Sequence, residues 1–271
     1  MIERALEKYL PPARAYPQEI HEAVRYAVLG GGKRYRPLVV LAACEAVGGL
    51  PQQALLPACA VEMIHAYSLV HDDLPALDND DTRRGKPTCH KQFGEALAIL
   101  AGDALLTQAF RLLSNVKPAQ KSVALIRELS EASGTHGMIG GQVADILISK
   151  NGKSHSLDSP TLDYISRHKT GRLIEASAVL GALIGTSSPS KIQRVRRFGK
   201  ALGLAFQVID DIMDGDGYLQ VMQPEEAEKK AEGLIQQAKR EAASFGNHGN
   251  RLIELADFLL NTIQNSKACT R

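Results

Sequence analysis

Two clusters of aspartates are the residues of this sequence best suited to chemistry. The first lies in the stretch SLVHDDLPALDNDDTRRGKP, where an apolar run is followed at once by Asp72, Asp73, Asp78, Asp80 and Asp81. Two carboxylates about 4 Å apart repel each other by roughly 4 kcal/mol at an effective dielectric of about 20. A buried cluster of this kind therefore requires cations, whereas a solvated helix end would tolerate it without them.

The second cluster lies in the stretch FQVIDDIMDGD and contains Asp210, Asp211 and Asp214. Residues four apart share one face of a helix, so Asp210 and Asp214 should point the same way. Their neighbours are mostly apolar, which is unusual for a solvated helix surface. A solvated surface is the alternative for either cluster alone, but two such clusters in one chain favour a shared chemical role.

Carboxylate oxygens select a hard cation, and Mg²⁺ prefers octahedral oxygen coordination. It is commonly bound by one or two carboxylates, several waters and the phosphates of a substrate. The two clusters together therefore predict a phosphorylated substrate that is bridged to the protein by Mg²⁺.

Basic residues near the first cluster support a phosphorylated substrate. The stretch GGGKRYRP places Lys33, Arg34 and Arg36 after three glycines, and Arg83 and Arg84 follow the aspartates. Arginine matches phosphate geometry with two parallel hydrogen bonds, and lysine adds a mobile point charge. GGGK lacks the spacing of a P-loop, so a helix end followed by an exposed basic turn remains the alternative.

Histidines 65, 71 and 90 lie near the first cluster, and His65 precedes Asp72 by two helical turns. Phosphate contact and core packing are both open for His65, whereas core packing is the simpler interpretation of His71. In HKTG, residues 168–171, Lys169 and Thr170 are a further possible phosphate contact.

Composition excludes several other classes of function. The 271 residues are 44% hydrophobic and carry a formal net charge of +2, so nucleic acid is not an expected partner. Four scattered cysteines form no CxxC motif, which argues against a zinc site or a disulfide framework. The sequence MIERALEKYLPP lacks the apolar core of a signal peptide, and no run of 18 apolar residues predicts a membrane span. A cytoplasmic protein is the simplest expectation.

The elements that must position these residues are helices. Apolar residues recur at intervals of three and four through residues 20–28, and the glycines at 30–32 should end that helix. Further helices are expected over 37–48, 51–73, 91–115, 119–150, 159–184, 189–215, 224–242 and 248–266, with no convincing strands. These patterns predict one all-α domain over residues 1–271.

As an ordered set, the motifs resemble the trans-prenyl diphosphate synthases, especially bacterial farnesyl and plant-type geranylgeranyl diphosphate synthases. The resemblance runs from Glu22 to Gly217. It is carried by LGGGKRYRP, by the stretch from EMIHAYSLVHDD to LAGDAL, and by GGQVADI, HKTG and FQVIDDIMD.

The resemblance implies an isoprenoid-synthase-type helical bundle around a deep central cavity. It implies that Asp72, Asp73, Asp78, Asp210, Asp211 and Asp214 hold three Mg²⁺ ions on an allylic diphosphate. It also implies an isopentenyl diphosphate pocket formed by Lys33, Arg36, His65 and Arg84. Contacts to the allylic diphosphate or its metals would come from Arg83, Lys169, Thr170 and Gln207.

The implied reaction is the coupling of isopentenyl diphosphate to an allylic diphosphate, dimethylallyl or geranyl, after the C–O bond ionises. Tyr67, with Ser68 beside it, resembles the floor that stops chain growth at farnesyl diphosphate. Geranylgeranyl and geranyl diphosphate are the alternatives, and a homodimer is the implied assembly.

Two departures from the family pattern limit what can be carried over. The first helix is short, and the segment after Asp214 lacks the family's lysine-bearing loop; neither Lys229 nor Lys230 is identified as a replacement by spacing. A non-catalytic partner subunit therefore remains an alternative. An HD-type phosphohydrolase and a terpene cyclase are the other rivals, but the first leaves FQVIDDIMD unexplained and the second usually needs more aromatic residues.

Overall fold

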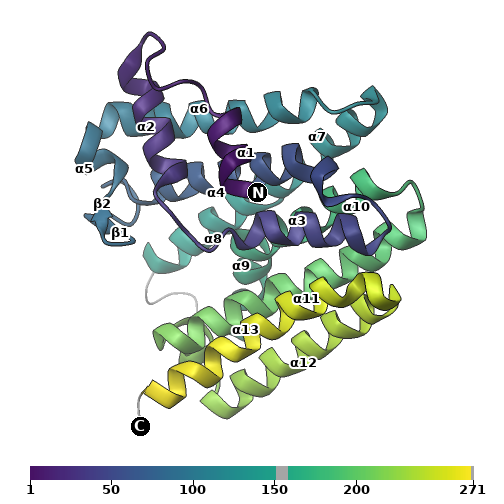
Figure 1. Ribbon diagram of the computed structural model, residues 1–271. Helices are drawn as coiled ribbons and strands as arrows, with labels where there is room; N and C mark the ends of the chain where they lie inside the picture. Colours follow the sequence, from purple (N-terminus) through teal and green to yellow (C-terminus); the bar gives the residue numbers. More distant parts are fainter. Residues whose placement is uncertain (151–157, 270–271) are drawn as a thin grey trace. The chain divides into compact units, whose positions relative to one another are not determined.

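The computed structural model describes residues 1–150 and 158–269, and helices dominate this part of the chain (Figure 1). The α-helices are α1 (Ile2–Tyr9), α2 (Gln18–Leu29), α3 (Tyr35–Ala46), α4 (Leu55–Asp72), α5 (Cys89–Phe93), α6 (Glu95–Ser114), α7 (Ala119–Ser133), α8 (Met138–Lys150), α9 (Ser159–Ile165), α10 (Arg172–Gly185), α11 (Pro189–Asp214), α12 (Pro224–Ala243) and α13 (Asn250–Cys269). Short 3₁₀ turns are η1 (Pro51–Ala54), η3 (Gly217–Gln220) and η4 (Gly246–Gly249), and η2 (Ser166–Gly171) is a π-helical turn. The prediction of an all-α helical bundle is confirmed.

The chain forms two compact units, of which the first comprises Met1–Leu38 and Leu55–Ile126. Within it, α4 packs along α6, and α2 contacts both of these helices. Residues 57–64 of α4 are all buried. A helix that is apolar all round belongs in a core, so α4 is the central element of this unit and brings Asp72 to its own C-terminal end.

Two stretches, 51–72 and 95–114, are long and apolar enough to cross a membrane when judged by length and composition alone. In the first, 67% of the most apolar window is buried inside the protein, and in the second 39% is buried. Core helices pass the same test, so neither stretch argues for a membrane span. A location in the cytoplasm stays a prediction.

The second unit comprises Val39–Ala54 and Arg127–Arg271. Its centre is α11, which contacts α10, α12 and α13, the last two being the yellow-green and yellow helices of Figure 1. A Cβ atom on Gly203 would lie 2.8 Å from the Cα of Gly171, and one on Gly199 would lie 2.8 Å from the Cα of Glu175. These two glycines therefore let α11 approach η2 and α10 more closely than any larger residue could.

Most predicted helices are present, but glycines divide two of them. The predicted helix 91–115 is interrupted at Gly94, whose φ of 86° is outside the helical region. The predicted helix 119–150 is interrupted between Ser133 and Met138, where a Cβ on Gly137 would lie 2.1 Å from the carbonyl oxygen of Ala132. The division into two units leaves the single domain over residues 1–271 as a prediction.

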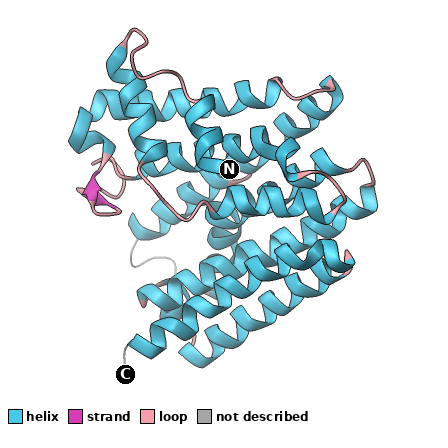
Figure 2. Cartoon of the chain, in the orientation of Figure 1, coloured by secondary structure: helices cyan, strands magenta, loops and turns pink. Residues whose placement is uncertain are grey.

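A small hairpin was not predicted, because two-residue strands leave no alternating pattern in the sequence. Its strands are β1 (Thr82–Arg83) and β2 (Lys86–Pro87), which pair antiparallel with Arg83 opposite Lys86 (Figure 2). The turn residues Arg84 and Gly85 have φ values of 53° and 73°. Two positive φ angles are the signature of the tight turns that match strand twist, so the hairpin fixes the direction of both arginines.

Candidate active site

The first aspartate cluster lies where α4 ends and a short loop folds back on it. The amide of Asp78 donates to the carbonyl of Asp72 at 2.8 Å, and the amide of Asp80 donates to the carbonyl of Asp73 at 3.2 Å. Asn79 adopts a φ of 54°, which asparagine tolerates better than most residues. The loop therefore satisfies the last carbonyls of α4 and returns its acidic residues towards the helix end.

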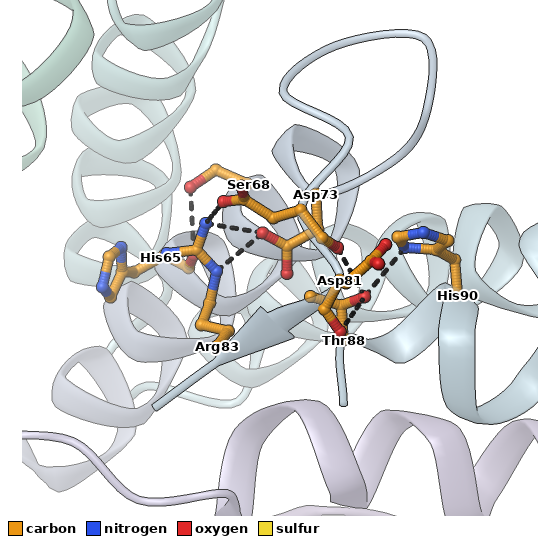
Figure 3. Close-up of polar contacts among 8 residues, drawn as sticks. His65, Ser68, Asp73, Asp81, Arg83, Thr88 and His90 are labelled. Atoms are coloured by element: carbon orange, nitrogen blue, oxygen red, sulfur yellow. Dashed lines mark hydrogen bonds and ion pairs between the residues drawn. The ribbon is translucent and has the colours of Figure 1, made fainter. Parts of the chain in front are cut away.

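Asp73 is the buried acid of this cluster, with 3% of its surface exposed. Its Oδ1 accepts hydrogen bonds from Arg83, 2.7 Å from Nε and 2.5 Å from Nη2 (Figure 3). Burial raises the pKa of Asp73 above its ordinary value, while the Arg83 guanidinium lowers it, and burial prevails. Arg83 also contacts Asp80 at 3.2 Å. Arg83, which is predicted to bind diphosphate, therefore neutralises part of the negative charge of the predicted metal site.

The other acids of the cluster differ in exposure. Asp72 is half-buried, whereas Asp78, Asp80 and Asp81 are exposed. Asp81 is paired with Lys91 at 2.8 Å, and this pairing lowers the pKa of Asp81. Behind them, the Thr88 hydroxyl donates to the carbonyl of Asp80 at 2.8 Å. Sequence reasoning missed Thr88, which has no motif signal and is identified only by the loop geometry.

Three of the residues predicted to bind isopentenyl diphosphate, His65, Arg36 and Arg84, lie near one another within the first unit. His65 is half-buried, and its pKa is held well below the ordinary value, first by burial and then by Arg36, Arg84, Arg83 and Arg34. The imidazole is therefore neutral at physiological pH and stands in a field of positive charge. This field is the electrostatic environment that a phosphate group requires.

Two of the arginines around His65, Arg34 and Arg84, bind groups inside the first unit. Arg34 is buried and bound to Glu62 at 2.7 Å and to the carbonyl of Val28 at 2.8 Å, so its charge is used inside the unit. Arg84 donates to the carbonyl of Gly31, and a Cβ on Gly32 would lie 2.5 Å from its guanidinium. Gly32 of GGGKRYRP thus leaves room for the Arg84 guanidinium, while Lys33 is exposed on the same turn.

Tyr67 and Ser68 lie one to two turns before Asp72 on α4. Tyr67 is 6% exposed, and its ring meets that of His71 edge to face with the centroids 5.8 Å apart. Burial, with a smaller contribution from Asp72, raises the pKa of Tyr67 to about 12. Ser68 donates to the carbonyl of His65 at 2.9 Å. His71 contacts the carbonyl of Ile99 at 3.0 Å, which supports its interpretation as a packing residue.

The second aspartate cluster occupies the C-terminal turn of α11. Asp210 and Asp214 are exposed and lie one helical turn apart, as the spacing predicts for a shared helix face, while Asp211 is half-buried. Asp211 accepts hydrogen bonds from the side chain of Gln207 at 2.7 Å and from the main-chain NH of Tyr218 at 3.0 Å. Burial raises its pKa, and these two hydrogen bonds lower it less than burial raises it.

The predicted residues Lys169, Thr170 and Gln207 lie together with Asp211 in the second unit. The Thr170 hydroxyl donates to Gln207 at 2.7 Å, and Gln207 in turn donates to Asp211. Lys169 is bound to Asp145 at 2.6 Å. Both Lys169 and Thr170 lie on η2, and π-helical turns occur frequently at functional sites. Asp145 belongs to the motif GGQVADI, but sequence reasoning did not identify it as a site residue.

The donor atoms of the site fit Mg²⁺ better than a transition metal. Within residues 1–150 and 158–269, no three His, Cys, Asp or Glu side chains stand close enough together to hold a metal ion. Each aspartate cluster therefore supplies only part of a coordination shell, and all of its donors are oxygens. Mg²⁺ binds in this way, because waters and substrate phosphates complete its octahedron.

Comparisons with known proteins all identify prenyl diphosphate synthases as similar to this chain. The sequence pattern of one family, polyprenyl synthetase, matches residues 17–239. Geranylgeranyl pyrophosphate synthase 4 of Arabidopsis thaliana is 51% identical over 79% of this chain. The matched region spans 57% of that relative's own length. Geranylgeranyl diphosphate synthase of Cyanophora paradoxa is 43% identical over 96% of this chain and 93% of its own. The crystal structure of an FPP/GFPP synthase from Zymomonas mobilis superposes with a TM-score of 0.90 at 38% identity, covering 96% of this chain and 94% of that one.

Proposed function

The chain belongs to the polyprenyl synthetase family, and from this premise we propose that it couples isopentenyl diphosphate to an allylic diphosphate. The observation that carries the proposal is the pairing, within each unit, of an aspartate motif with residues suited to a diphosphate. Arg83 lies against Asp73 in the first unit. In the second unit, Thr170 donates to Gln207, which in turn donates to Asp211, and Lys169 precedes Thr170 on the same turn.

In this proposal Asp72, Asp73 and Asp78 form one metal-binding motif, and Asp210, Asp211 and Asp214 form the other. Bound Mg²⁺ would supply positive charge to the leaving diphosphate. Arg83 in the first unit, and Lys169 and Thr170 in the second, would contact diphosphate and stabilise its charge as the C–O bond breaks. The number of ions, three by resemblance, is part of the proposal.

The protein itself needs no general base for the coupling step. The double bond of isopentenyl diphosphate attacks C1 of the allylic cation, and the proton that is then lost passes to the released diphosphate. His65 has a pKa well below its ordinary value and is surrounded by arginines, so it serves as a neutral hydrogen-bonding partner for isopentenyl diphosphate. The Ala- and Leu-rich helices would exclude water, which quenches such a cation.

We propose farnesyl diphosphate as the main product, because Tyr67 is a bulky residue buried five positions before Asp72, or about 7.5 Å along the helix. Geranylgeranyl diphosphate is the alternative, and it is the product in the names of the two relatives above. Truncation of Tyr67, the residue proposed to limit chain growth, should lengthen the product. We expect Tyr67→Ala to shift it by one or more C5 units in chromatography, whereas Tyr16→Ala, which truncates a tyrosine that is 95% exposed, should not.

One assay tests the proposed activity against its rivals. Pure protein is incubated with isopentenyl diphosphate, Mg²⁺ and either dimethylallyl or geranyl diphosphate, with EDTA in a parallel sample, and the products are identified by mass. Coupled products that disappear with EDTA are expected. Absence of coupling at every chain length would favour a partner subunit, and hydrolysis without coupling would favour a phosphohydrolase.

The family resemblance also leads us to propose a homodimer. Ile99 and Leu100 on α6 are 45% and 54% exposed, and Val123 on α7 is 56% exposed. Exposed apolar side chains such as these commonly become buried at subunit interfaces. The molar mass measured by light scattering should be twice the mass of one chain, which is 29.3 kDa. A monomeric mass at micromolar concentration would contradict the assembly without contradicting the activity.

A further inference from the structure

The segment after Asp214 takes part in a part-buried network that the family motifs do not include. Gly215, with a φ of 73°, ends α11, and the chain turns back through η3. The amide of Asp216 donates to the carbonyl of Asp211 at 3.0 Å. Tyr218, two residues after Asp216, is fully buried. A short segment is therefore folded tightly against the end of the second aspartate motif.

Tyr218 is held at both of its ends. Its hydroxyl donates to Oδ1 of Asp163 at 2.5 Å, and its main-chain NH donates to Oδ2 of Asp211 at 3.0 Å. Asp163 lies on α9 and Asp211 on α11. The side chain thus anchors the turn to one helix, while the main chain of the same residue holds a carboxylate of the other.

Lys230 completes the anchor from α12. Its Nζ donates to the same Oδ1 of Asp163 at 2.5 Å and lies 4.4 Å from the centroid of the Tyr218 ring. Burial would raise the pKa of Asp163, but the hydrogen bonds from Lys230 and Tyr218 lower it below its ordinary value. Asp163 therefore stays ionised and binds both donors strongly.

The turn also leaves Asp211 little freedom to move. Gly217 has a φ of 53°, and a Cβ atom at this position would lie 2.0 Å from Oδ2 of Asp211. Gln207 holds the other oxygen of the same carboxylate. Both oxygens are thus positioned by neighbouring groups before any ligand arrives.

We propose that Tyr218, anchored by Asp163 and Lys230, is a positioning residue that fixes the Asp211 carboxylate for metal binding. The proposal rests on the proposed function, in which Asp211 binds the metal ions of a diphosphate. It also assigns Lys230 a role in the anchor, in the region where the family's lysine-bearing loop is missing. Partners that orient a metal ligand commonly change metal affinity by about 10–100-fold when they are removed.

Tyr218→Phe and Lys230→Met test the anchor, and Lys239→Met is the matched control. Tyr218→Phe keeps the main-chain NH, so any effect on Asp211 must pass through the lost hydroxyl. Lys239 lies on the same helix as Lys230 and makes a similar ion pair, 2.7 Å from Asp257, away from this network. The readouts are the Mg²⁺ concentration for half-maximal coupling and the Mg²⁺-dependent binding of inorganic diphosphate by calorimetry.

We expect both anchor variants to need roughly tenfold more Mg²⁺, while the rate at saturating Mg²⁺ is largely kept and the control matches wild type. Unchanged Mg²⁺ dependence and unchanged diphosphate binding in a folded Lys230→Met protein would overturn the proposal, even if Tyr218→Phe fails to fold. Weakened diphosphate binding in the variants, with no coupling by wild type, supports the anchor and contradicts only the proposed activity. Failure of wild type to bind diphosphate with Mg²⁺ contradicts both.

Discussion

The two aspartate motifs share composition and a place at a helix end, yet their buried carboxylates are supported differently. Asp73 lies against the guanidinium of Arg83, whereas Asp211 is held by a neutral amide and a main-chain NH. Burial raises the pKa of both carboxyl groups. The first motif therefore carries its own counter-charge, while the second keeps its negative charge for a ligand. Similar sequence motifs can thus differ in electrostatic state.

The largest expected effect tests whether both motifs serve one reaction. Asp72→Ala and Asp210→Ala should each reduce kcat more than about 100-fold, which corresponds to ~3 kcal/mol on the barrier. Residues that act as one unit are not additive, so the double variant should be little worse than either single one. Steady-state kinetics with saturating substrates measures this, and losses that multiply would separate the roles of the two motifs.

The next prediction concerns the different supports of Asp73 and Asp211. A hydrogen bond to a charged group contributes about 1.5–3 kcal/mol, so Arg83→Gln should lower kcat/KM by about tenfold or more. Arg83 lowers the pKa of Asp73. Its removal should raise that pKa further and move the acidic limb of the pH profile to higher pH.

Gln207→Leu provides the matched comparison for this profile. Gln207 also lowers the pKa of its carboxylate, but through a hydrogen bond from an uncharged amide. The acidic limb should therefore move in the same direction by less. Equal shifts in the two variants would contradict the distinction between a charged and a neutral support.

A third prediction concerns stability without metal. The folded-state pKa of Asp211 is raised, so its negative charge costs stability at any pH above that value, and this cost disappears as pH falls through it. Asp211→Asn should therefore raise the melting temperature at pH 7 in EDTA by about 1–3 °C while impairing coupling. Asp73→Asn should gain less, because it leaves Arg83 without its main partner. Thermal unfolding of both variants across pH 5–8 tests the order.

The smallest effect is expected at Asp81, an exposed acid paired only with Lys91 among the contacts described above. Exposed ion pairs contribute little to stability. Asp81→Asn should change kcat and KM by less than about twofold, which separates the solvated acids of the first motif from those that bind metal. A loss comparable to that of Asp72→Ala would place Asp81 in the site.

The helices could be predicted from the sequence because their apolar spacing is local. Some helix boundaries could not be predicted because they depend on the backbone conformation of a glycine. The apolar spacing continues across Gly94, but the positive φ angle of this residue ends one helix and begins the next. The site residues were predictable as a set, but their pairings were not. The contact between Tyr218 and Asp163 joins residues 55 positions apart, and neither residue belongs to a motif, so no local pattern could reveal it.

The π-helical turn at Ser166–Gly171 has a consequence for the chain's tolerance of insertions and deletions. Its wider turn sets the rotational phase between α9 and α10, and Lys169 and Thr170 both lie inside it. Loss of one residue here would rotate everything beyond it by roughly 100° about the helix axis. Lys169 would then turn away from Asp145, and Thr170 away from Gln207, although no functional residue had been replaced. Length, as much as identity, is constrained in this segment.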